Sequence, residues 1–283
     1  MHWHVILPGL IALVSCVGCV GPARLVRTAD YAEVQLAPVV DDLARFDVVF
    51  LGELHDSDQG HVFQAAVVEA LAERHGRVAV ALEMFERDVQ AELDRYLAGE
   101  IDRDAFLDAA RPWSNYARHY EPVVEAQRRR GAPVLAANVP RELARRVVRT
   151  GLDAVLGEPF APREVDPARV GAYREKLLAL MREHDANLEL ADRAIAAQCL
   201  KDDAMAESIA DFLEREPGTP VIVLMGAFHC EERLGTVERL AARRPDLELV
   251  VVGMARRPEY DPDDTAERAR GRYVLYVGDS ASD

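Results

Sequence analysis

The sequence has too little positive charge for a protein that binds nucleic acid or an anionic membrane surface non-specifically. Its 34 lysines and arginines stand against 49 aspartates and glutamates, which gives a formal net charge of −15 at pH 7. Such a chain is repelled by phosphate groups, so no nucleic-acid partner is expected. The sequence also lacks low-complexity tracts and repeats of a fixed period, so it is not an array of repeated units.

Cysteines are few as well, and two of the four lie in an unusual N-terminal segment. The apolar run from Val5 to Val14 is too short to span a bilayer, and its length is typical of the core of a signal peptide. Leu-Val-Ser-Cys over 13–16 resembles a bacterial lipobox, in which the cysteine is lipidated and becomes the first residue. We therefore expect a lipoprotein signal peptide over 1–15 and lipidation of Cys16.

Two alternatives to this interpretation stay open. Cys19 is a second candidate for lipidation, although its upstream position is not aliphatic, and histidines replace the usual lysine or arginine at the start of the segment. The segment is otherwise a plain secretory signal or an N-terminal anchor helix. A lipoprotein would be anchored to a bacterial membrane in the cell envelope and would face outside the cytoplasm.

The remainder of the chain is long enough for one sizeable core, because 49% of its 283 residues are hydrophobic. We expect a tether over 16–34 and a single domain over 35–283. Outside the cytoplasm, Cys199 and Cys230 form either a disulfide or two buried thiols, and the sequence does not decide between them.

Six apolar runs rich in β-branched residues recur along this domain, with helical stretches between them. The runs are continuous rather than alternating, as expected for strands that are covered on both faces. Strands that alternate with helices favour right-handed crossovers and a mainly parallel sheet, so the sequence predicts a three-layer α/β/α fold. The predicted strands cover residues 47–53, 77–85, 132–140, 219–229, 247–254 and 272–278.

Helices are predicted between these strands. The Asp-Ser-Asp cluster over 56–58 is typical of a helix start, and that helix ends at Gly76. Two further helices are expected over 141–149 and 231–243.

Two longer stretches, about 86–130 and 160–216, are rich in helix formers and contain no strand-like run. We expect them to be helical insertions on the C-terminal edge of the strands, where insertions commonly form lids over a site.

Acidic residues and histidines follow the predicted strands at the points where ligands bind in open parallel sheets. Two of the strands end in the same pattern, Gly-x-x-His, at 52–55 and 226–229. The glycines permit a sharp turn or the close approach of a ligand. Because the carboxyl ends of parallel strands meet at one edge, we expect the side chains to form one cluster. Its members are Glu53, His55, Glu83 and His229.

This set of side chains is compatible with two kinds of chemistry. Two imidazoles and two carboxylates can hold a divalent transition metal with an open position. Without a metal, a histidine can act as a general base that a glutamate orients, which is the catalytic role expected of these residues in a hydrolase. The alternative is that the residues merely populate polar strand ends.

Further motifs make the sequence resemble a known family. Beside the two Gly-x-x-His patterns, these are Glu83-Met84-Phe85, the stretch Ala-Asn-Val-Pro-Arg-Glu over 137–142, the aromatic pattern around Trp113, Tyr116 and Tyr120, and Ala197-Gln198…Asp202…Met205-Ala206. Over about residues 35–280 the sequence resembles the ChaN-like haem-binding uptake family, of the superfamily that includes Tiki, TraB and the erythromycin esterases.

The resemblance implies an α/β sandwich with helical insertions and a haem-binding role in iron uptake. The wider superfamily implies a different activity, because its Tiki-type members are metal-dependent proteases and its esterases are hydrolases. A third interpretation is a structural envelope lipoprotein whose site is inert. The expected partners are haem and a membrane reached through the lipid anchor, with a homodimer as a possible assembly.

For the residues that would contact haem, the sequence leaves several candidates. Trp113, Tyr116 and Tyr120 are spaced three and four apart and share a helix face, which is typical of core packing as well as of a cofactor site. Gln198 and Met205 share another face, together with Asp202 and Ile209. The candidates for the axial iron ligand are Tyr116, Tyr120, His119, His184, His55 and His229.

Overall fold

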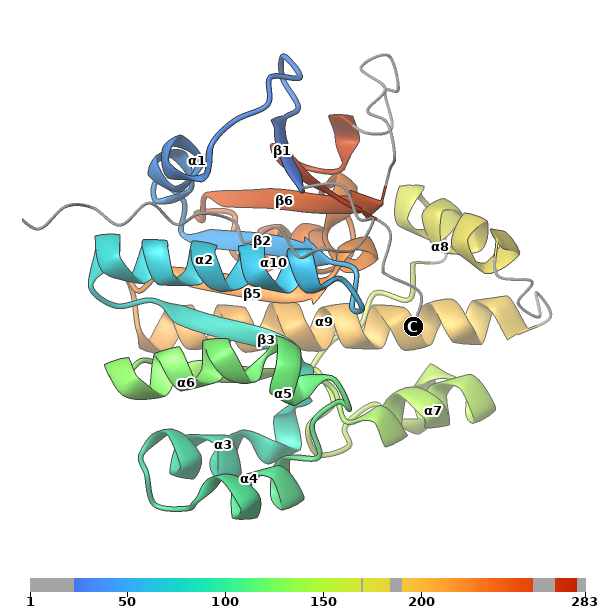
Figure 1. Ribbon diagram of the computed structural model, residues 1–283. Coiled ribbons are helices and arrows are strands. Elements are labelled where there is room, and N and C mark those ends of the chain that lie inside the picture. Colours follow the sequence, from blue (N-terminus) through green and yellow to red (C-terminus); the bar gives the residue numbers. More distant parts are fainter. Residues whose placement is uncertain (1–22, 169, 184–189, 257–267, 279–283) are drawn as a thin grey trace, which may run out of the picture.

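In the described residues of a computed structural model, 23–168, 170–183, 190–256 and 268–278, seven strands form one sheet (Figure 1). The order of the strands along the sheet is β1-β7-β6-β2-β5-β3-β4. All neighbours are parallel except β1, which runs antiparallel to β7. The strands are β1 (Arg24–Arg27), β2 (Val48–Glu53), β3 (Ala79–Glu86), β4 (Val134–Asn138), β5 (Val221–Gly226), β6 (Leu249–Arg256) and β7 (Tyr273–Val277).

Six of these strands lie where the sequence predicted them, and the mainly parallel sheet is confirmed. All residues of β2, β3, β4 and β5 are buried. Such strands need apolar side chains on both faces, which is why they appear in the sequence as continuous apolar runs.

The first strand, β1, is not predicted by the sequence. It lies within residues 16–34, the expected tether, yet Leu25 and Val26 are buried and the strand pairs with β7 near the other end of the chain. A four-residue edge strand gives no periodic signal that could be recognised without its partner. Arg24–Arg27 therefore belong to the sheet rather than to a tether.

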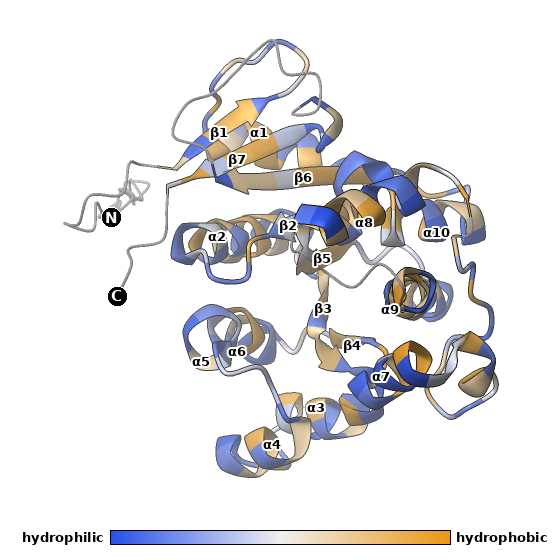
Figure 2. Cartoon of the chain, turned by 90° about the vertical axis from the view of Figure 1, so that its right-hand side faces the viewer, coloured by the Kyte–Doolittle hydropathy of each residue, from blue (hydrophilic) through white to orange (hydrophobic). Residues whose placement is uncertain are grey.

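Helices cover both faces of the sheet, as the end-on view of the strands shows (Figure 2). Alternate strand residues point to opposite sides: Val49 and Leu51 pack in one core, and Val48 and Phe50 pack in the other. This arrangement confirms the three-layer α/β/α fold. The first core is covered by α1 (Leu36–Leu43), α2 (Asp58–His75) and α6 (Glu121–Arg130), and the second by α9 (Ala191–Arg215) and α10 (Thr236–Arg243).

The two helix-rich segments contribute both to these layers and to the carboxyl edge of the sheet. Whereas α6 and much of α9 run beside the strands, α5, α7 and α8 lie toward the carboxyl ends of the strands (Figure 1). The segments are therefore not lids alone. The remaining α-helices are α3 (Gln90–Leu97), α4 (Arg103–Ala110), α5 (Tyr116–His119), α7 (Arg141–Thr150) and α8 (Ala172–Glu183). Short 3₁₀ helices are η1 (Arg87–Val89), η2 (Leu152–Ala154), η4 (Ala227–His229) and η5 (Glu231–Arg233).

Helix ends follow the local chemistry. The hydroxyl oxygen of Ser57 accepts a hydrogen bond from the backbone N–H of Gly60 at 3.1 Å, which caps α2 as predicted. The helix predicted from residue 231 instead begins at Thr236. Its start is displaced because Glu232 and Arg233 have positive φ values of 62° and 58°, which interrupt the helical path.

Two further findings concern the cysteines and the membrane. Cys199 and Cys230 are free and buried, so the second of the two predicted alternatives holds. Burial raises the pKa of Cys199 to about 12. Within the described part of the chain, no helix combines the length and the apolar character needed to cross a bilayer.

Candidate functional site

The structure brings Glu53, His55, Glu83 and His229 together at the carboxyl edge of the sheet. Glu53 ends β2, Glu83 lies in the second half of β3, and His55 and His229 follow β2 and β5; the three strands are neighbours in the order β2-β5-β3. A Cβ atom placed on Gly226 would lie 3.2 Å from Nε2 of His55 and 3.4 Å from Oε2 of Glu83. Because both side chains approach the backbone so closely here, a larger residue at 226 would have to displace one of them.

His55 is held from one side by Glu53. Nδ1 of His55 lies 2.8 Å from Oε1 of Glu53, and the same oxygen accepts a hydrogen bond from the Tyr120 hydroxyl. The other carboxylate oxygen accepts a hydrogen bond from Nε2 of Gln64 at 2.9 Å. Since an ionised carboxylate only accepts, Nδ1 of His55 carries the hydrogen, and Nε2 of the neutral ring has a lone pair.

The side chain of His55 is also reachable from solvent, because 43% of its surface is exposed. Burial lowers its pKa, but the hydrogen bond to Glu53 and the charges of Glu83 and Glu53 outweigh this effect, so the pKa is raised above 6.5. The ring of Trp113 lies edge-on against the imidazole, with 4.8 Å between the ring centroids. His55 is therefore oriented and partly open.

His229 has the opposite environment. Its side chain is 0% exposed, and its Nδ1 donates to Oδ1 of Asp202 at 2.7 Å. Asp202 also accepts hydrogen bonds from Thr236, at 2.8 Å, and from the hydroxyl of Tyr173. Nε2 of His229 has no hydrogen-bond partner and faces Oε1 of Glu83 at 3.4 Å.

The buried charges stabilise one another. Burial lowers the pKa of His229, but the charges of Asp202 and Glu83 outweigh burial and raise it to about 9. Burial raises the pKa of Glu83, yet the charge of His229 and its contact with the carboxylate hold that pKa well below 4.5. Glu83 is further fixed by the backbone N–H of Gly226, which donates to Oε2 at 2.7 Å. We therefore expect an imidazolium at His229 near neutral pH.

The first Gly-x-x-His pattern also requires its glycine. A Cβ atom on Gly52 would lie 3.1 Å from Cα of Ala227 and 3.1 Å from Sγ of Cys230. The two patterns therefore pack against each other, and each glycine admits an atom that belongs to the other pattern or to its neighbours.

Two histidines that the sequence analysis did not assign to the Glu/His cluster extend it. His61 and His119 are buried and stacked, with 4.0 Å between the ring centroids. Nε2 of His61 donates to the carbonyl oxygen of His55 at 3.2 Å, and burial lowers the pKa of His61. Nε2 of His119 donates to Asp58 at 2.8 Å. A histidine inside a helix has no distinctive sequence signal, so only the fold reveals this pair.

The predicted aromatic face is mostly part of the core. Tyr116 is 3% exposed and Tyr120 is 1% exposed, and burial raises the pKa of both. The Tyr116 hydroxyl has no partner, and the Tyr120 hydroxyl is taken by Glu53. Neither hydroxyl can reach a ligand at the surface without a rearrangement, so the expectation that they face haem directly is not supported. Only Trp113, which is half-buried, contacts His55.

The predicted face of α9 also contains one fully buried and one half-buried residue. Met205 is fully buried among strand residues of the second core, so it contributes packing rather than a haem contact. Gln198 is half-buried, and its side-chain oxygen has no hydrogen-bond partner. His184, a candidate iron ligand, lies outside the described residues, as do Cys16 and Cys19.

The divalent-metal site predicted from the four cluster residues is not supported. Within residues 23–168, 170–183, 190–256 and 268–278, no group of three or more His, Cys, Asp or Glu side chains could hold a metal ion. The two carboxylates of the cluster, and Nδ1 of each histidine, are already engaged within the protein. Glu53 accepts from three side chains, Glu83 accepts from Gly226, and His229 is engaged by Asp202.

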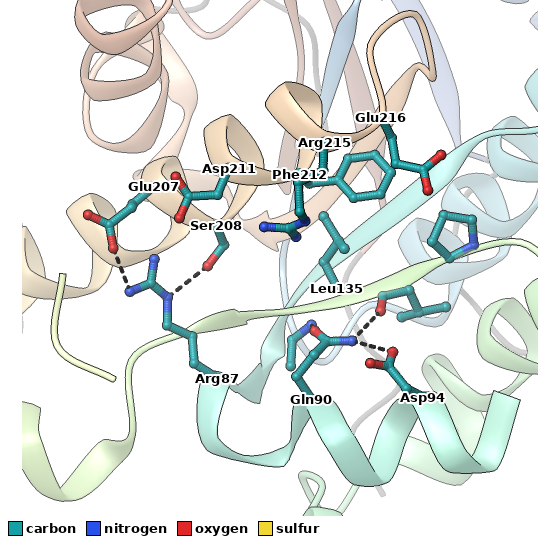
Figure 3. A pocket seen from close by; sticks show the side chains of 13 residues that line it. Arg87, Gln90, Asp94, Leu135, Glu207, Ser208, Asp211, Phe212, Arg215 and Glu216 are labelled. Atoms are coloured by element: carbon teal, nitrogen blue, oxygen red, sulfur yellow. Dashed lines mark hydrogen bonds and ion pairs between the residues drawn. The ribbon is translucent and has the colours of Figure 1, made fainter. Parts of the chain in front are cut away.

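A cavity lies away from this cluster, at the outer edge of β4 (Figure 3). Its volume is about 460 Å³. The side chain of Gln90 lines it and occupies the free edge of the strand: its Nε2 donates to the carbonyl oxygen of Val134 at 2.9 Å, and its Oε1 accepts from Ala136 N at 2.7 Å. Arg87 closes another wall by pairing with Glu207 at 3.0 Å. The side chain of Gln90 thus protects the free edge of β4, and the cavity is separate from the Glu/His cluster.

The family described as "Haem-binding uptake, Tiki superfamily, ChaN" matches residues 39–240. The chain belongs to this family. The matched range includes the Glu/His cluster and Asp202, so the resemblance expected from the sequence motifs is confirmed.

Solved structures share the fold of this ChaN-family protein. ChaN of Campylobacter jejuni, described with cofacial haem binding, matches with a TM-score of 0.70 at 20% identity, over 90% of this chain and 96% of that chain. An erythromycin esterase mutant in its open conformation matches with a TM-score of 0.47 at 14% identity, over 91% and 83% of the two chains. At 20% identity the likeness to the Campylobacter jejuni protein shows the fold alone. No curated protein matches the chain.

Proposed function

We propose that this protein binds haem at the carboxyl edge of its sheet and serves haem or iron uptake as a lipoprotein of the cell envelope. Family membership supports haem as the ligand. One observation carries the choice of site: the imidazole of His55 is oriented by Glu53 through Nδ1 while its ring stays 43% exposed.

The geometry of His55 suits an axial ligand of haem iron. Haem iron binds a neutral imidazole through a nitrogen lone pair, and a carboxylate on the other ring nitrogen fixes the ring and raises its basicity. Glu53 fills that role, and Tyr120 and Gln64 hold Glu53 in place. Four of the other predicted candidates are less suitable, because His229, His119, Tyr116 and Tyr120 are buried.

Aromatic side chains lie against His55 and against His229, the two histidines of the cluster. Trp113 contacts the His55 ring from one side, and Leu54 beside it is half-buried. Phe228, two residues after Gly226, is also half-buried and packs against His229 with 3.8 Å between the ring centroids. A porphyrin needs such apolar and aromatic surface beside its iron ligand.

The test is a titration of the purified full chain with haemin, followed by its visible absorption spectrum. We expect saturable binding with a Soret band of a histidine-ligated haem. His55→Ala should weaken binding by more than about tenfold, because removing only the partner of a metal-ligating histidine already costs about 10–100-fold. His75→Ala, on an exposed turn of α2, is the matched control and should leave both readouts unchanged. Binding no stronger than that of an unrelated acidic protein would rule the function out.

A hydrolase is the second candidate, because the same His55–Glu53 pair is the arrangement that a general base requires. It needs no iron and predicts no Soret band. Turnover of a peptide or ester substrate that disappears in His55→Ala, without saturable haemin binding by the parent protein, would favour this candidate instead.

A further inference from the structure

His55, the proposed iron ligand, lies in a short connection between two elements. Strand β2 ends at Glu53 and helix α2 begins at Asp58, so His55 belongs to neither of them. Within the connection, a backbone hydrogen bond from the N–H of Ser57 to the carbonyl oxygen of Leu54, at 2.9 Å, spans His55. Because a metal ligand has to be held to within about 0.5 Å, contacts from outside the connection are needed to fix this residue.

Two side chains hold the carbonyl oxygen of His55. Nδ2 of Asn115 donates to it at 2.9 Å, and Nε2 of His61 donates to it at 3.2 Å. Asn115 directly precedes α5 and His61 lies in α2, so the two donors come from different elements. A carbonyl oxygen has two lone pairs, and these two donors can engage both of them.

A chain of hydrogen bonds determines which end of the Asn115 amide faces His55. Nε2 of His119 donates to Oδ1 of Asp58 at 2.8 Å, so Nδ1 of the neutral His119 ring is an acceptor. This Nδ1 lies 3.1 Å from Nδ2 of Asn115, and the amide N–H₂ group must therefore face it. One amide hydrogen goes to His119, and the other goes to the carbonyl oxygen of His55.

The residues around α5 contact the His55 region at three points. Trp113 packs edge-on against the ring, with 4.8 Å between the ring centroids. The Tyr120 hydroxyl donates to Glu53, which in turn holds Nδ1 of the ring. Asn115 is the one of these three contacts that reaches the backbone. The ring and the backbone of His55 are therefore held by different groups.

We propose that Asn115 is a positioning residue for the iron ligand: it fixes the backbone of His55 while Glu53 orients the ring. The proposal rests on the proposed function and adds a residue to the same site. Both amide hydrogens of Asn115 are used within the protein, so it acts through His55 rather than on the porphyrin. Without Asn115 one donor to the carbonyl oxygen is lost, and the connection opens more readily.

The first test is hydrogen–deuterium exchange of the free full chain, measured by mass spectrometry on a peptide that covers 54–57. In Asn115→Ala we expect faster exchange of this peptide, because opening of the connection exposes the N–H of Ser57. Gln90→Ala is the matched control, since it also removes hydrogen bonds between a half-buried amide side chain and the backbone, but at β4. It should leave the peptide unchanged. Parent-like exchange in Asn115→Ala would overturn the proposal.

The second test measures haemin affinity in a double-mutant cycle of Asn115→Ala and His55→Ala. We expect Asn115→Ala to weaken binding about fivefold in the parent background, the factor that one hydrogen bond supports. In the His55→Ala background it should have no effect, because a positioning residue acts only through the ligand that it holds. Gln90→Ala should leave the affinity unchanged in both backgrounds.

Two results of this cycle would contradict a positioning role: an unchanged affinity in Asn115→Ala, or an equal loss in both backgrounds. A parent protein that binds no haemin would instead overturn the proposed function. The exchange measurement needs no haemin and would still decide whether Asn115 holds His55, so the two failures are distinguishable.

Discussion

The two Gly-x-x-His patterns are alike in sequence, yet their histidines differ in burial and in charge. His55 follows β2 and remains 43% exposed, whereas His229 follows β5 within η4 and is 0% exposed. The difference comes from the helices packed against His229: Asp202 of α9 accepts its Nδ1 hydrogen bond, and Tyr173 of α8 donates to Asp202. Of these two histidines, only His55 can therefore contact a ligand without local unfolding. His229 instead pairs with the buried carboxylate of Glu83.

The raised pKa of His229 predicts how stability depends on pH. Its folded pKa of about 9 exceeds the ordinary value of 6.5, so the stabilisation is complete below pH 6.5 and is lost as the pH rises through about 9. The loss is on the order of 3 kcal/mol in the free energy of unfolding. Urea unfolding at pH 6.5, 8 and 10 measures it.

Two variants separate His229 from other groups that titrate in this range. His229→Gln should be less stable at pH 6.5 and should show a much smaller decline between pH 6.5 and 10. His75→Gln, at the exposed end of α2, should behave like the parent. An equally steep decline in His229→Gln would show that another group causes it.

At the scale of elements, burial explains which parts of the fold could be predicted from the sequence. Strands β2 to β5 are buried throughout and give continuous apolar runs, so their positions and the parallel sheet follow from the pattern. β1 and the start of α10 could not be found in this way. The first depends on pairing with β7, and the second depends on positive φ values at Glu232 and Arg233.

The helices α3 and α4 are attached to the rest of the molecule by an aromatic cluster. Phe106 of α4 is fully buried and stacks on Tyr96 of α3, with 4.4 Å between the ring centroids. It also contacts Phe85 of β3 at 5.7 Å and Tyr116 of α5 at 6.3 Å. One side chain thus connects three helices to the sheet.

Phe106→Ala should therefore lower the free energy of unfolding by about 3–5 kcal/mol, because it removes a large buried side chain and leaves a cavity. Leu107→Ala is the control on the same helix, and its half-buried side chain should cost clearly less. Chemical denaturation of both variants measures the difference. Equal losses would mean that α4 is held by general packing rather than by this cluster.

At the scale of the whole molecule, the strand ends could be predicted to converge, but the partners of the cluster could not. Glu53 and Glu83 lie in strands that the sequence reveals, His55 and His229 follow such strands, and parallel strands share one carboxyl edge. Asp202 and His61 reach the same place from helices, where the sequence does not fix the facing side. The same reason explains why buried Tyr116 and Tyr120 were expected to face haem.

The N-terminus also approaches the sheet from the edge that carries the site. Because β1 is antiparallel to β7, Arg24 pairs with Tyr276 near the carboxyl end of β7. Only three strand spacings, roughly 15 Å, separate β1 from β2 in the order β1-β7-β6-β2. An anchor at Cys16 would extend at most about 30 Å from Arg24, at about 3.5 Å per residue. A lipid at this position would hold the His55 edge near the membrane.

We therefore predict that Cys16 is the lipidated first residue of the mature protein and that it alone determines membrane attachment. Mass spectrometry of the membrane-extracted protein should find an N-terminal peptide that begins with a diacylated or triacylated Cys16. Cys16→Ser should move the protein to the soluble fraction, whereas Cys19→Ser should leave it with the membrane. Haemin affinity should be the same in both variants, because the proposed iron ligand and its partners all lie in the folded domain. A lipidated Cys19 would move the mature N-terminus by three residues. An unmodified N-terminus at any other residue would contradict the lipid anchor.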